Sequence, residues 1–314
     1  MKPKTKVLLC GLYYPLAILR YFEKAFEKNP DIELRTCGSY TGAQIPWMGG
    51  MTLPAKYAKS PTYPIFGSSN RFFSWNLIAG GLDGWKPDLV VTVDAGWNWI
   101  DRPKVDCPVV TVGTDPHVLD YSHARAISDK FFNMQKVYMQ EGDIYLPYAF
   151  SQYDHFKDVS FDEKMVDAVL IGMPYDNRVK FVSALRQAGV SVVFENGPIF
   201  DEYRQLNNRA SIGLNWSSMD DLVARVFELM AMGLCPVINR VTDLKEFFIE
   251  GEHYLGFSSL EEGVEAVLWA KSHPIEARII AENAHILMWK NSVNKHPQHS
   301  YSERVQQILI EVGL

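Results

Sequence analysis

The sequence contains few cysteines, and none are spaced as in a metal-binding or redox motif. They are Cys10, Cys37, Cys107 and Cys235, in a chain of 314 residues. Three of them lie in apolar, strand-like segments, so we expect reduced core thiols rather than disulfides, as in a cytoplasmic protein. His296 and His299 would supply only two metal ligands, and we therefore predict no metal site.

The chain also lacks a long apolar run and a large excess of one charge. With 31 basic and 37 acidic residues, the formal net charge of -6 gives no overall attraction to nucleic acid or to an anionic membrane. Lysines before the apolar run Val7–Leu19 resemble a signal peptide, but Gly11 and Pro15 interrupt the run and no cleavage site follows. No segment reaches the ~20 apolar residues that span a bilayer, so we expect a cytoplasmic protein without a membrane span.

A dinucleotide-binding fingerprint is missing as well. The first predicted strand, Lys6–Cys10, is followed by Gly11-Leu12-Tyr13-Tyr14-Pro15, which is not G-x-G-x-x-G. A glycine at this turn can still let backbone amides approach a ligand. Tyr13 and Tyr14 are therefore candidates for contacts with a substrate.

Short apolar runs alternate with helical patterns, which predicts an α/β fold with parallel sheets. With 47% hydrophobic residues the chain can bury two cores. The polar, aperiodic stretch Ala149–Lys164 is interpreted as a linker. We predict domains at residues 1–150 and 151–290, and a terminal helical segment at 291–314.

Polar residues follow two predicted strands of the first half. Asp94 comes after Pro87–Val93, and Asp115 and His117 come after Pro108–Val112. Ligands of α/β sheets bind at the carboxyl ends of strands, so Asp115 and His117 are candidate acid, base or acceptor-orienting groups. Asp before Pro is also common turn chemistry, and this alternative stays open.

An irregular segment, Gly38–Asn70, is rich in Gly, Pro, Tyr and Trp, including Trp47. Its aromatic residues could stack on a sugar or a base while Lys56 and Lys59 serve a phosphate. An ordered loop packed on its own aromatics would show the same composition.

The most informative stretch is Ser211–Glu246. Its spacing predicts a helix from Asp220 or Asp221 to Met232, with Ser218 or Asp220 as the cap and Gly233 as the stop. Asp221, Arg225 and Glu228 then lie along one side of that helix.

Arg225–Glu228, followed by Met230–Gly233 and Pro236-Val237, resembles the donor-binding signature of group-1 glycosyltransferases of the GT-B fold, in particular the CgeB-like, spore-maturation-type branch. The resemblance implies two Rossmann-like domains facing a central cleft, with a C-terminal helix that crosses back to the first domain. In this superfamily two acidic residues separated by seven positions frame the nucleotide-sugar. Here they are Asp220 and Glu228, an Asp replacing the usual first Glu.

The resemblance implies that Glu228 holds the ribose, and that Asp220 contacts the sugar and is catalytic together with Asp115 and His117. It assigns the donor pyrophosphate to the loop at Gly172 and to Arg178. The full set of predicted donor-binding residues is Gly172, Arg178, Glu195, Asn215, Ser217, Asp221, Arg225 and Glu228. The predicted acceptor-side residues are Tyr13, Tyr14, Trp47 and Asp94.

The resulting hypothesis is a glycosyltransferase that uses a nucleotide-diphosphate sugar, with UDP-sugar as the expected donor. We expect a retaining, metal-independent reaction with no cofactor beyond the donor. The acceptor stays open among a saccharide, a protein, a small aglycone and a modified DNA base. The alternatives are a nucleotide-sugar epimerase or hydrolase of the same fold, and a non-catalytic nucleotide-sugar-binding protein.

Overall fold

The computed structural model describes residues 3–45, 51–65, 72–94, 98–217, 219 and 221–314. Its contacts divide the chain into two compact units. Unit 1 comprises Met1–Pro147 and Arg304–Leu314, and unit 2 comprises Tyr148–Glu303. The predicted Trp47 and Asp220 lie outside the described residues.

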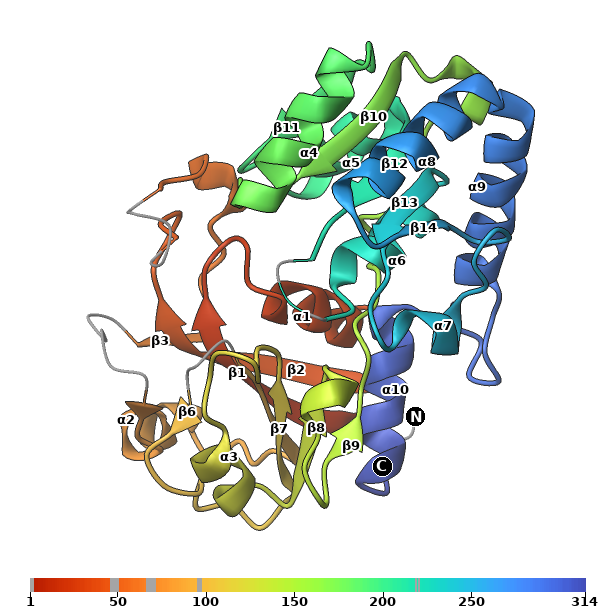
Figure 1. The fold of residues 1–314 in the computed structure, drawn as a ribbon. Helices are drawn as coiled ribbons and strands as arrows, with labels where there is room; N and C mark the ends of the chain where they lie inside the picture. The colour runs from red at the N-terminus through yellow and green to blue at the C-terminus, as the bar shows by residue number, and fades with distance from the viewer. Residues whose placement is uncertain (1–2, 46–50, 66–71, 95–97, 218, 220) are drawn as a thin grey trace. The chain divides into compact units, whose positions relative to one another are not determined.

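Unit 1 is built on a parallel sheet with the strand order β3-β2-β1-β5-β7-β8-β9 (Figure 1). Its central strands are continuous apolar runs because parallel sheets are covered on both faces. Two further short strands, β4 and β6, pair with each other. The strands are β1 Thr5–Tyr13, β2 Ile32–Tyr40, β3 Tyr63–Ile65, β4 Phe72–Phe73, β5 Leu89–Asp94, β6 Asn98–Trp99, β7 Val109–Gly113, β8 Lys130–Asn133 and β9 Ile144–Tyr145.

The helices of unit 1 are short apart from the first and the last. They are α1 Leu19–Glu27, η1 Ala55–Tyr57, α2 Asn76–Ala79, η2 Gly80–Leu82, α3 Ser122–Ile127, η3 Lys136–Tyr138 and the terminal α10 Tyr301–Glu311. Helix α10 packs beside the last strands, where Arg304 Nε donates to Pro147 O (2.7 Å) and Gln307 Nε2 donates to Tyr145 O (3.0 Å). The C-terminal segment therefore completes unit 1.

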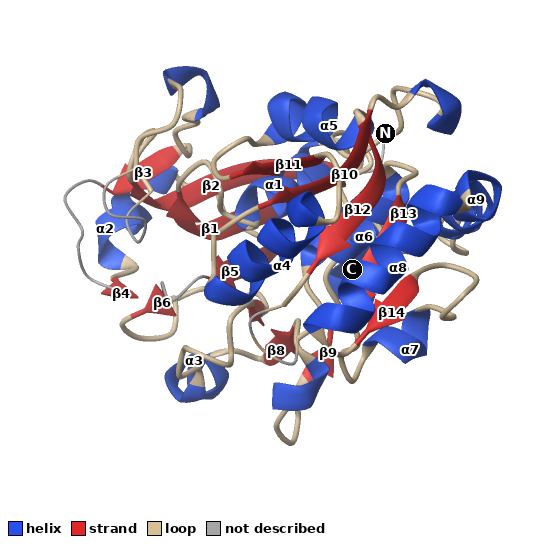
Figure 2. Ribbon diagram, turned by 45° about the horizontal axis from the view of Figure 1, so that its top comes forward, coloured by secondary structure: helices blue, strands red, loops and turns tan. Residues whose placement is uncertain are grey.

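Unit 2 holds a second parallel sheet, with the order β11-β10-β12-β13-β14. Its strands, drawn in red in Figure 2, alternate along the chain with helices, drawn in blue. The strands are β10 Val166–Ile171, β11 Val192–Glu195, β12 Ala210–Asn215, β13 Cys235–Asn239 and β14 Leu255–Phe257. The helices are η4 Phe161–Glu163, α4 Asp176–Gln187, α5 Phe200–Asn208, α6 Ala224–Ala231, α7 Leu244–Phe247, α8 Leu260–Ser272 and α9 Pro274–Trp289.

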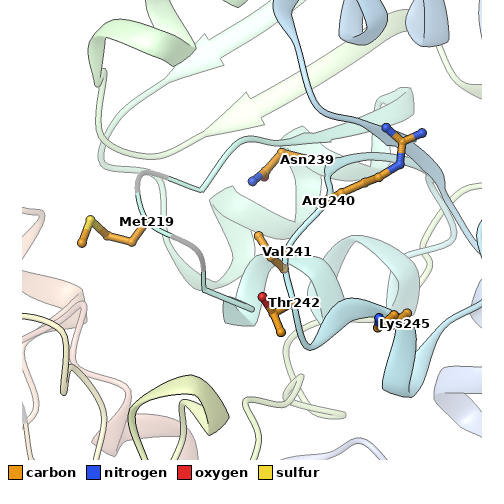
Figure 3. A pocket seen from close by; sticks show the side chains of 6 residues that line it. All are labelled: Met219, Asn239, Arg240, Val241, Thr242 and Lys245. Atoms are coloured by element: carbon orange, nitrogen blue, oxygen red, sulfur yellow. The ribbon is translucent and has the colours of Figure 1, made fainter.

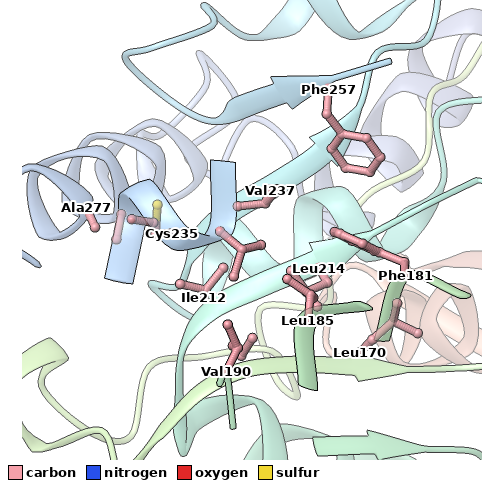
Figure 4. Close-up of a cluster of buried hydrophobic side chains, with 14 of the residues drawn as sticks. Leu170, Phe181, Leu185, Val190, Ile212, Leu214, Cys235, Val237, Phe257 and Ala277 are labelled. Carbon is pink, nitrogen blue, oxygen red and sulfur yellow. The ribbon is translucent and has the colours of Figure 1, made fainter. Parts of the chain in front are cut away.

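Two apolar clusters cover the two faces of this sheet. On one face, residues of α4, α8 and α9 pack against Ile212, Leu214 and Val237 (Figure 4). On the other face, Tyr203 of α5 and Leu229 of α6 pack against β10 and β12. Burial on both faces is what selects the apolar sequences of these strands.

The helix that carries Arg225 and Glu228 begins later than the sequence predicts. Helix α6 starts at Ala224, and its N-cap Val223 provides no side-chain hydrogen bond. Its close approach to β12 depends on Gly213, where a Cβ would lie 2.8 Å from Leu229 Cδ2. Packing on the sheet, rather than a polar cap, therefore determines where α6 forms.

The core of unit 2 generates a stability prediction. Phe181 is fully buried and its ring lies 5.4 Å from that of Trp216 and 5.3 Å from that of Phe257. We expect Phe181→Ala to lower the free energy of unfolding by about 3–5 kcal/mol, because it leaves a cavity. Denaturant unfolding followed by circular dichroism measures this. Val179→Ala on the same helix, at a 45% exposed position, should shift the midpoint little, and equal effects would contradict the assignment.

Candidate functional site

The predicted donor-binding residues of unit 2 lie at the carboxyl ends of β10, β11 and β12, in the loop before α6, and on helices α4 and α6. Gly172 follows β10 with a φ of 147°, a conformation that favours glycine, and its N–H donates to Glu195 O (2.9 Å). A Cβ at this position would overlap the guanidinium of Arg225. Glycine is thus required both by the backbone conformation and by the arginine packed against it.

Two guanidinium groups converge on this turn. Arg178 of α4 is 5% exposed; its Nε donates to Trp216 O (2.8 Å) and its Nη1 to Met173 O (3.1 Å). Arg225 Nη1 donates to Asn215 Oδ1 (2.9 Å). Within the part of the chain that the structure describes, neither guanidinium forms an ion pair with a carboxylate.

Burial and the neighbouring Arg225 lower the pKa of Arg178 to about 10, and the charges of Tyr175 and Asp221 oppose this only in part. At neutral pH Arg178 is therefore still a cation. Because the hydrogen-bond partners of Arg178 and Arg225 are neutral, the positive charge at this turn is offset only in part, by the nearby Asp221. Such a group of donors at the end of a parallel strand is suited to an anion, above all a phosphate.

One helical turn beyond Arg225, the carboxylate of Glu228 is 8% exposed. Tyr203 Oη donates to its Oε2 (2.6 Å), and His155 Nε2 lies 3.8 Å from its Oε1. Burial, followed by the charge of Glu228, raises the pKa of Tyr203, so the phenol stays a donor. Sequence reasoning missed Tyr203 and His155, because only the fold brings them to α6.

A loop of hydrogen bonds joins the ends of β12 and β13. Asn239 Oδ1 accepts from Ser217 N (2.8 Å) and from Asn215 Nδ2 (3.4 Å). Ser217 Oγ donates to the carbonyl of the buried Asp221 (2.9 Å). Ser217 and Asp221 therefore order the loop that precedes α6, whereas Ser218 and Asp220, the residues expected to cap the helix, lie outside the described residues. This network also links Asn239 to Arg225 through Asn215.

A pocket opens beside Asn239 (Figure 3). It has a volume of about 590 Å³ and is lined by Met219, Asn239, Arg240, Val241, Thr242 and Lys245. Arg240 binds two carboxylates, with its Nη2 2.7 Å from Glu250 and its Nη1 2.8 Å from Glu262, and these contacts raise its pKa. These two ion pairs fix Arg240 in the wall of the pocket, and Asn239 and Thr242 contribute polar groups to its lining.

In unit 1, Asp115 and His117 lie in the turn after β7, both partly exposed. Asp115 Oδ2 accepts from Thr114 Oγ1 (2.6 Å), and Tyr121 Oη accepts from the backbone N–H of Asp115 (3.2 Å). The His117 ring lies 6.0 Å from the ring of Tyr138. Asp94 pairs with Gly113 at the same sheet edge, so the backbones of the three candidates are neighbours.

The remaining predicted residues have different surroundings. Strand β1 continues through Tyr13, whose side chain is fully buried and donates to Leu9 O (3.3 Å), so Tyr13 is a core residue; Tyr14 is 9% exposed. Glu195 is exposed, and it is its carbonyl that meets Gly172.

Lys59, considered above as a phosphate ligand, binds Glu23 (2.9 Å) and Glu27 (2.5 Å) of α1. Arg20 Nη1 also donates to Tyr57 O (3.1 Å), so this part of the irregular segment is anchored on α1. The expected phosphate role of Lys59 is replaced by a structural one, because two carboxylates satisfy its charge.

Among the described residues, no group of three or more His, Cys, Asp or Glu side chains is arranged to hold a metal ion. Likewise, none of the described helices is both long enough and apolar enough to cross a membrane.

Residues 162–310, slightly less than half of the chain, match the family model described as glycosyl transferase-like. A comparison with curated proteins gives no significant match.

Solved structures match over the full length. A glycosyltransferase from Rickettsia africae is 11% identical with a TM-score of 0.63, covering 98% of both chains. HepE of Anabaena in complex with UDP and glucose is 11% identical with a TM-score of 0.58, covering 98% of this chain and 99% of that one. UDP-GlcNAc 2-epimerase from Neisseria meningitidis bound to UDP-GlcNAc is 13% identical with a TM-score of 0.54, at the same coverage. The protein therefore has the GT-B fold of two Rossmann-like domains.

The contact between Gly172 and Arg225 generates a prediction. We expect Gly172→Ala to destabilise the protein by about 1–3 kcal/mol more than Gly189→Ala, because Gly189 also has a positive φ but faces open space. Adding Arg225→Ala should relieve part of the Gly172→Ala effect, since it removes the overlapping group. A double-mutant cycle by denaturant unfolding measures this, and strictly additive effects would disprove the contact.

Proposed function

We propose that the protein is a glycosyltransferase that moves a sugar from a nucleotide-diphosphate sugar, with UDP-sugar as the expected donor. The observation that carries the proposal is the pair of guanidiniums, Arg178 and Arg225, held by neutral acceptors at the Gly172 turn. The diphosphate of the donor carries the negative charge and the acceptor oxygens that two guanidiniums bind. The glycosyl transferase-like family match over residues 162–310 and the UDP complex of a protein with the same fold support it.

The position proposed for the diphosphate also indicates where the ribose of the nucleotide binds. Glu228 lies one turn along α6 from Arg225, with Oε2 held by Tyr203. A carboxylate there can accept hydrogen bonds from the ribose hydroxyls. We assign Glu228 this role, as the resemblance to group-1 enzymes implies.

The pocket beside Asn239 is the proposed place of the transferred sugar. Hydrogen bonds link Asn239, in the pocket wall, to Asn215, and Asn215 to Arg225. A sugar linked to a diphosphate at the two arginines can therefore reach the pocket. Asn239 and Thr242 offer an amide and a hydroxyl to sugar hydroxyl groups.

In the proposed reaction the bond from the anomeric carbon to the phosphate oxygen breaks, and a bond to an acceptor oxygen forms. The acceptor loses its proton, and negative charge develops on the leaving diphosphate. Arg178 and Arg225 stabilise that charge without a metal ion. We propose retention of the anomeric configuration by resemblance to group-1 enzymes, and roles for Asp115 and His117 in orienting or deprotonating the acceptor.

A nucleotide-sugar epimerase is the second candidate, because an epimerase bound to UDP-GlcNAc shares the fold. Product analysis discriminates between the two. A transferase needs an acceptor and releases the nucleoside diphosphate, whereas an epimerase converts one nucleotide-sugar into another without an acceptor.

The diphosphate site can be tested by calorimetry with UDP, GDP, ADP and TDP in the presence of EDTA. We expect one of these to bind, and Arg178→Gln to weaken its binding about 10- to 100-fold, because hydrogen bonds between charged groups are lost. The corresponding nucleoside should bind both proteins equally. Arg186→Gln, on the same helix but bonded only to Val192 O, is the matched control and should bind like the wild type. Absence of binding by all four diphosphates to folded protein would reject the proposal.

The sugar pocket makes a separate prediction. Thr242→Trp should fill the pocket and weaken binding of the intact nucleotide-sugar at least about 10-fold by steric exclusion. It should leave the nucleoside diphosphate unaffected, and the isosteric Thr242→Val is the control for loss of the hydroxyl alone. Competition binding measures both ligands; an equal loss for both would place the sugar elsewhere.

A further inference from the structure

A fully buried histidine, His155, lies beside the carboxylate of Glu228. Its Nε2 is 3.8 Å from Glu228 Oε1, and its ring meets the edge of Tyr203 with 5.7 Å between centroids. His155 belongs to the segment by which the chain enters unit 2, and Tyr203 belongs to α5. Three segments distant in the sequence thus meet at one carboxylate.

The hydrogen bond on the far side of the ring determines its tautomer. The backbone N–H of Ser151 donates to His155 Nδ1 (3.0 Å). Nδ1 must then carry a lone pair, so the neutral ring has its hydrogen on Nε2. The imidazole therefore presents an N–H group towards Glu228.

The backbone around His155 holds the ring in place. His155 N donates to Ser151 O (2.7 Å), which closes one helical turn. The adjoining Phe150 pairs with the segment by which the chain leaves unit 2, through Phe150 N to His299 O (3.0 Å) and Tyr301 N to Phe150 O (3.0 Å). Hydrogen bonds of its own backbone segment thus hold the ring of His155, whose position does not depend on Glu228.

The two oxygens of Glu228 have different surroundings. Oε2 accepts from Tyr203, while among the described residues no hydrogen bond is formed to Oε1. The N–H of His155 faces Oε1 at 3.8 Å, a distance at which it attracts the carboxylate oxygen but leaves the lone pairs of that oxygen to another donor.

We propose that His155 is a positioning residue for ribose recognition: its N–H group orients Glu228, so that Oε1 accepts from the ribose hydroxyls of a nucleoside diphosphate. This inference rests on the proposed function. It adds a residue that acts through Glu228 and does not itself touch the ligand.

Two variants isolate the proposed N–H group. His155→Phe keeps a ring against Tyr203 but has no donor, whereas His155→Gln can place an amide N–H near the position of Nε2. Both are expected to lose the contact with Ser151 N, so they differ in the donor that faces Glu228. His285→Phe is a second control, because His285 contacts Ala231 O at the other end of α6 (2.9 Å).

The measurement is the ratio of the dissociation constants of 2′,3′-dideoxy-UDP and UDP, with GDP and its dideoxy form as the second pair. We expect the wild type to prefer the ribonucleotide about 10-fold or more. His155→Phe should reduce this ratio to near unity, as Glu228→Ala does, while His155→Gln should recover most of it and His285→Phe should leave it unchanged.

The outcomes separate this inference from the proposed function. If none of UDP, GDP, ADP and TDP binds the folded wild type, the proposed function itself fails. If Glu228→Ala abolishes the preference for ribose but His155→Phe retains it, or weakens both nucleotides equally, the positioning role is overturned while the donor site stands. Equal ratios for the Phe and Gln variants would also overturn it.

Discussion

The proposed donor site depends on two like charges held close together. Arg178 and Arg225 repel each other, and the described structure gives them carbonyl and amide acceptors in place of carboxylates. These acceptors lie near the ends of adjacent strands, and glycine at position 172, which has no Cβ, leaves room for the guanidinium of Arg225. Such an arrangement is unfavourable for folding alone, and its stability is expected to rise when an anion binds.

Much of the fold was predictable because its signals are local. The buried strands, helices α5, α8 and α9 and the Rossmann-like alternation all follow from apolar runs and helical spacing. The start of α6 was not, since the helix begins at Ala224 without a side-chain cap and Ser217 takes part in the hydrogen bonds of the preceding loop. Strand β8, Lys130–Asn133, was not predictable either, because it contains only two apolar residues between a charged and a polar one; a 3₁₀ turn follows it at Lys136–Tyr138.

The site residues also divide into those with a local sequence signal and those brought together only by packing. Arg225 and Glu228 could be predicted because they share one face of one helix. His155 and Tyr203 could not, since they reach Glu228 only through packing of separate segments. Tyr13 shows the opposite error, a core residue taken for a site residue. Strand β1 extends beyond its apolar run through the predicted turn, so the side chain of Tyr13 is buried in the core.

All described residues of the proposed donor site belong to unit 2, from the Gly172 turn to the pocket at Thr242. The proposed nucleotide site is thus assigned from residues of unit 2, whereas transfer to an acceptor needs a second substrate and a means of removing its proton. A protein could keep the first property and lose the second, so nucleotide affinity alone does not distinguish an enzyme from a binding protein. The roles proposed for Asp115 and His117 are the part of the proposal that distinguishes the two, because a transferase requires groups at the acceptor whereas a binding protein does not.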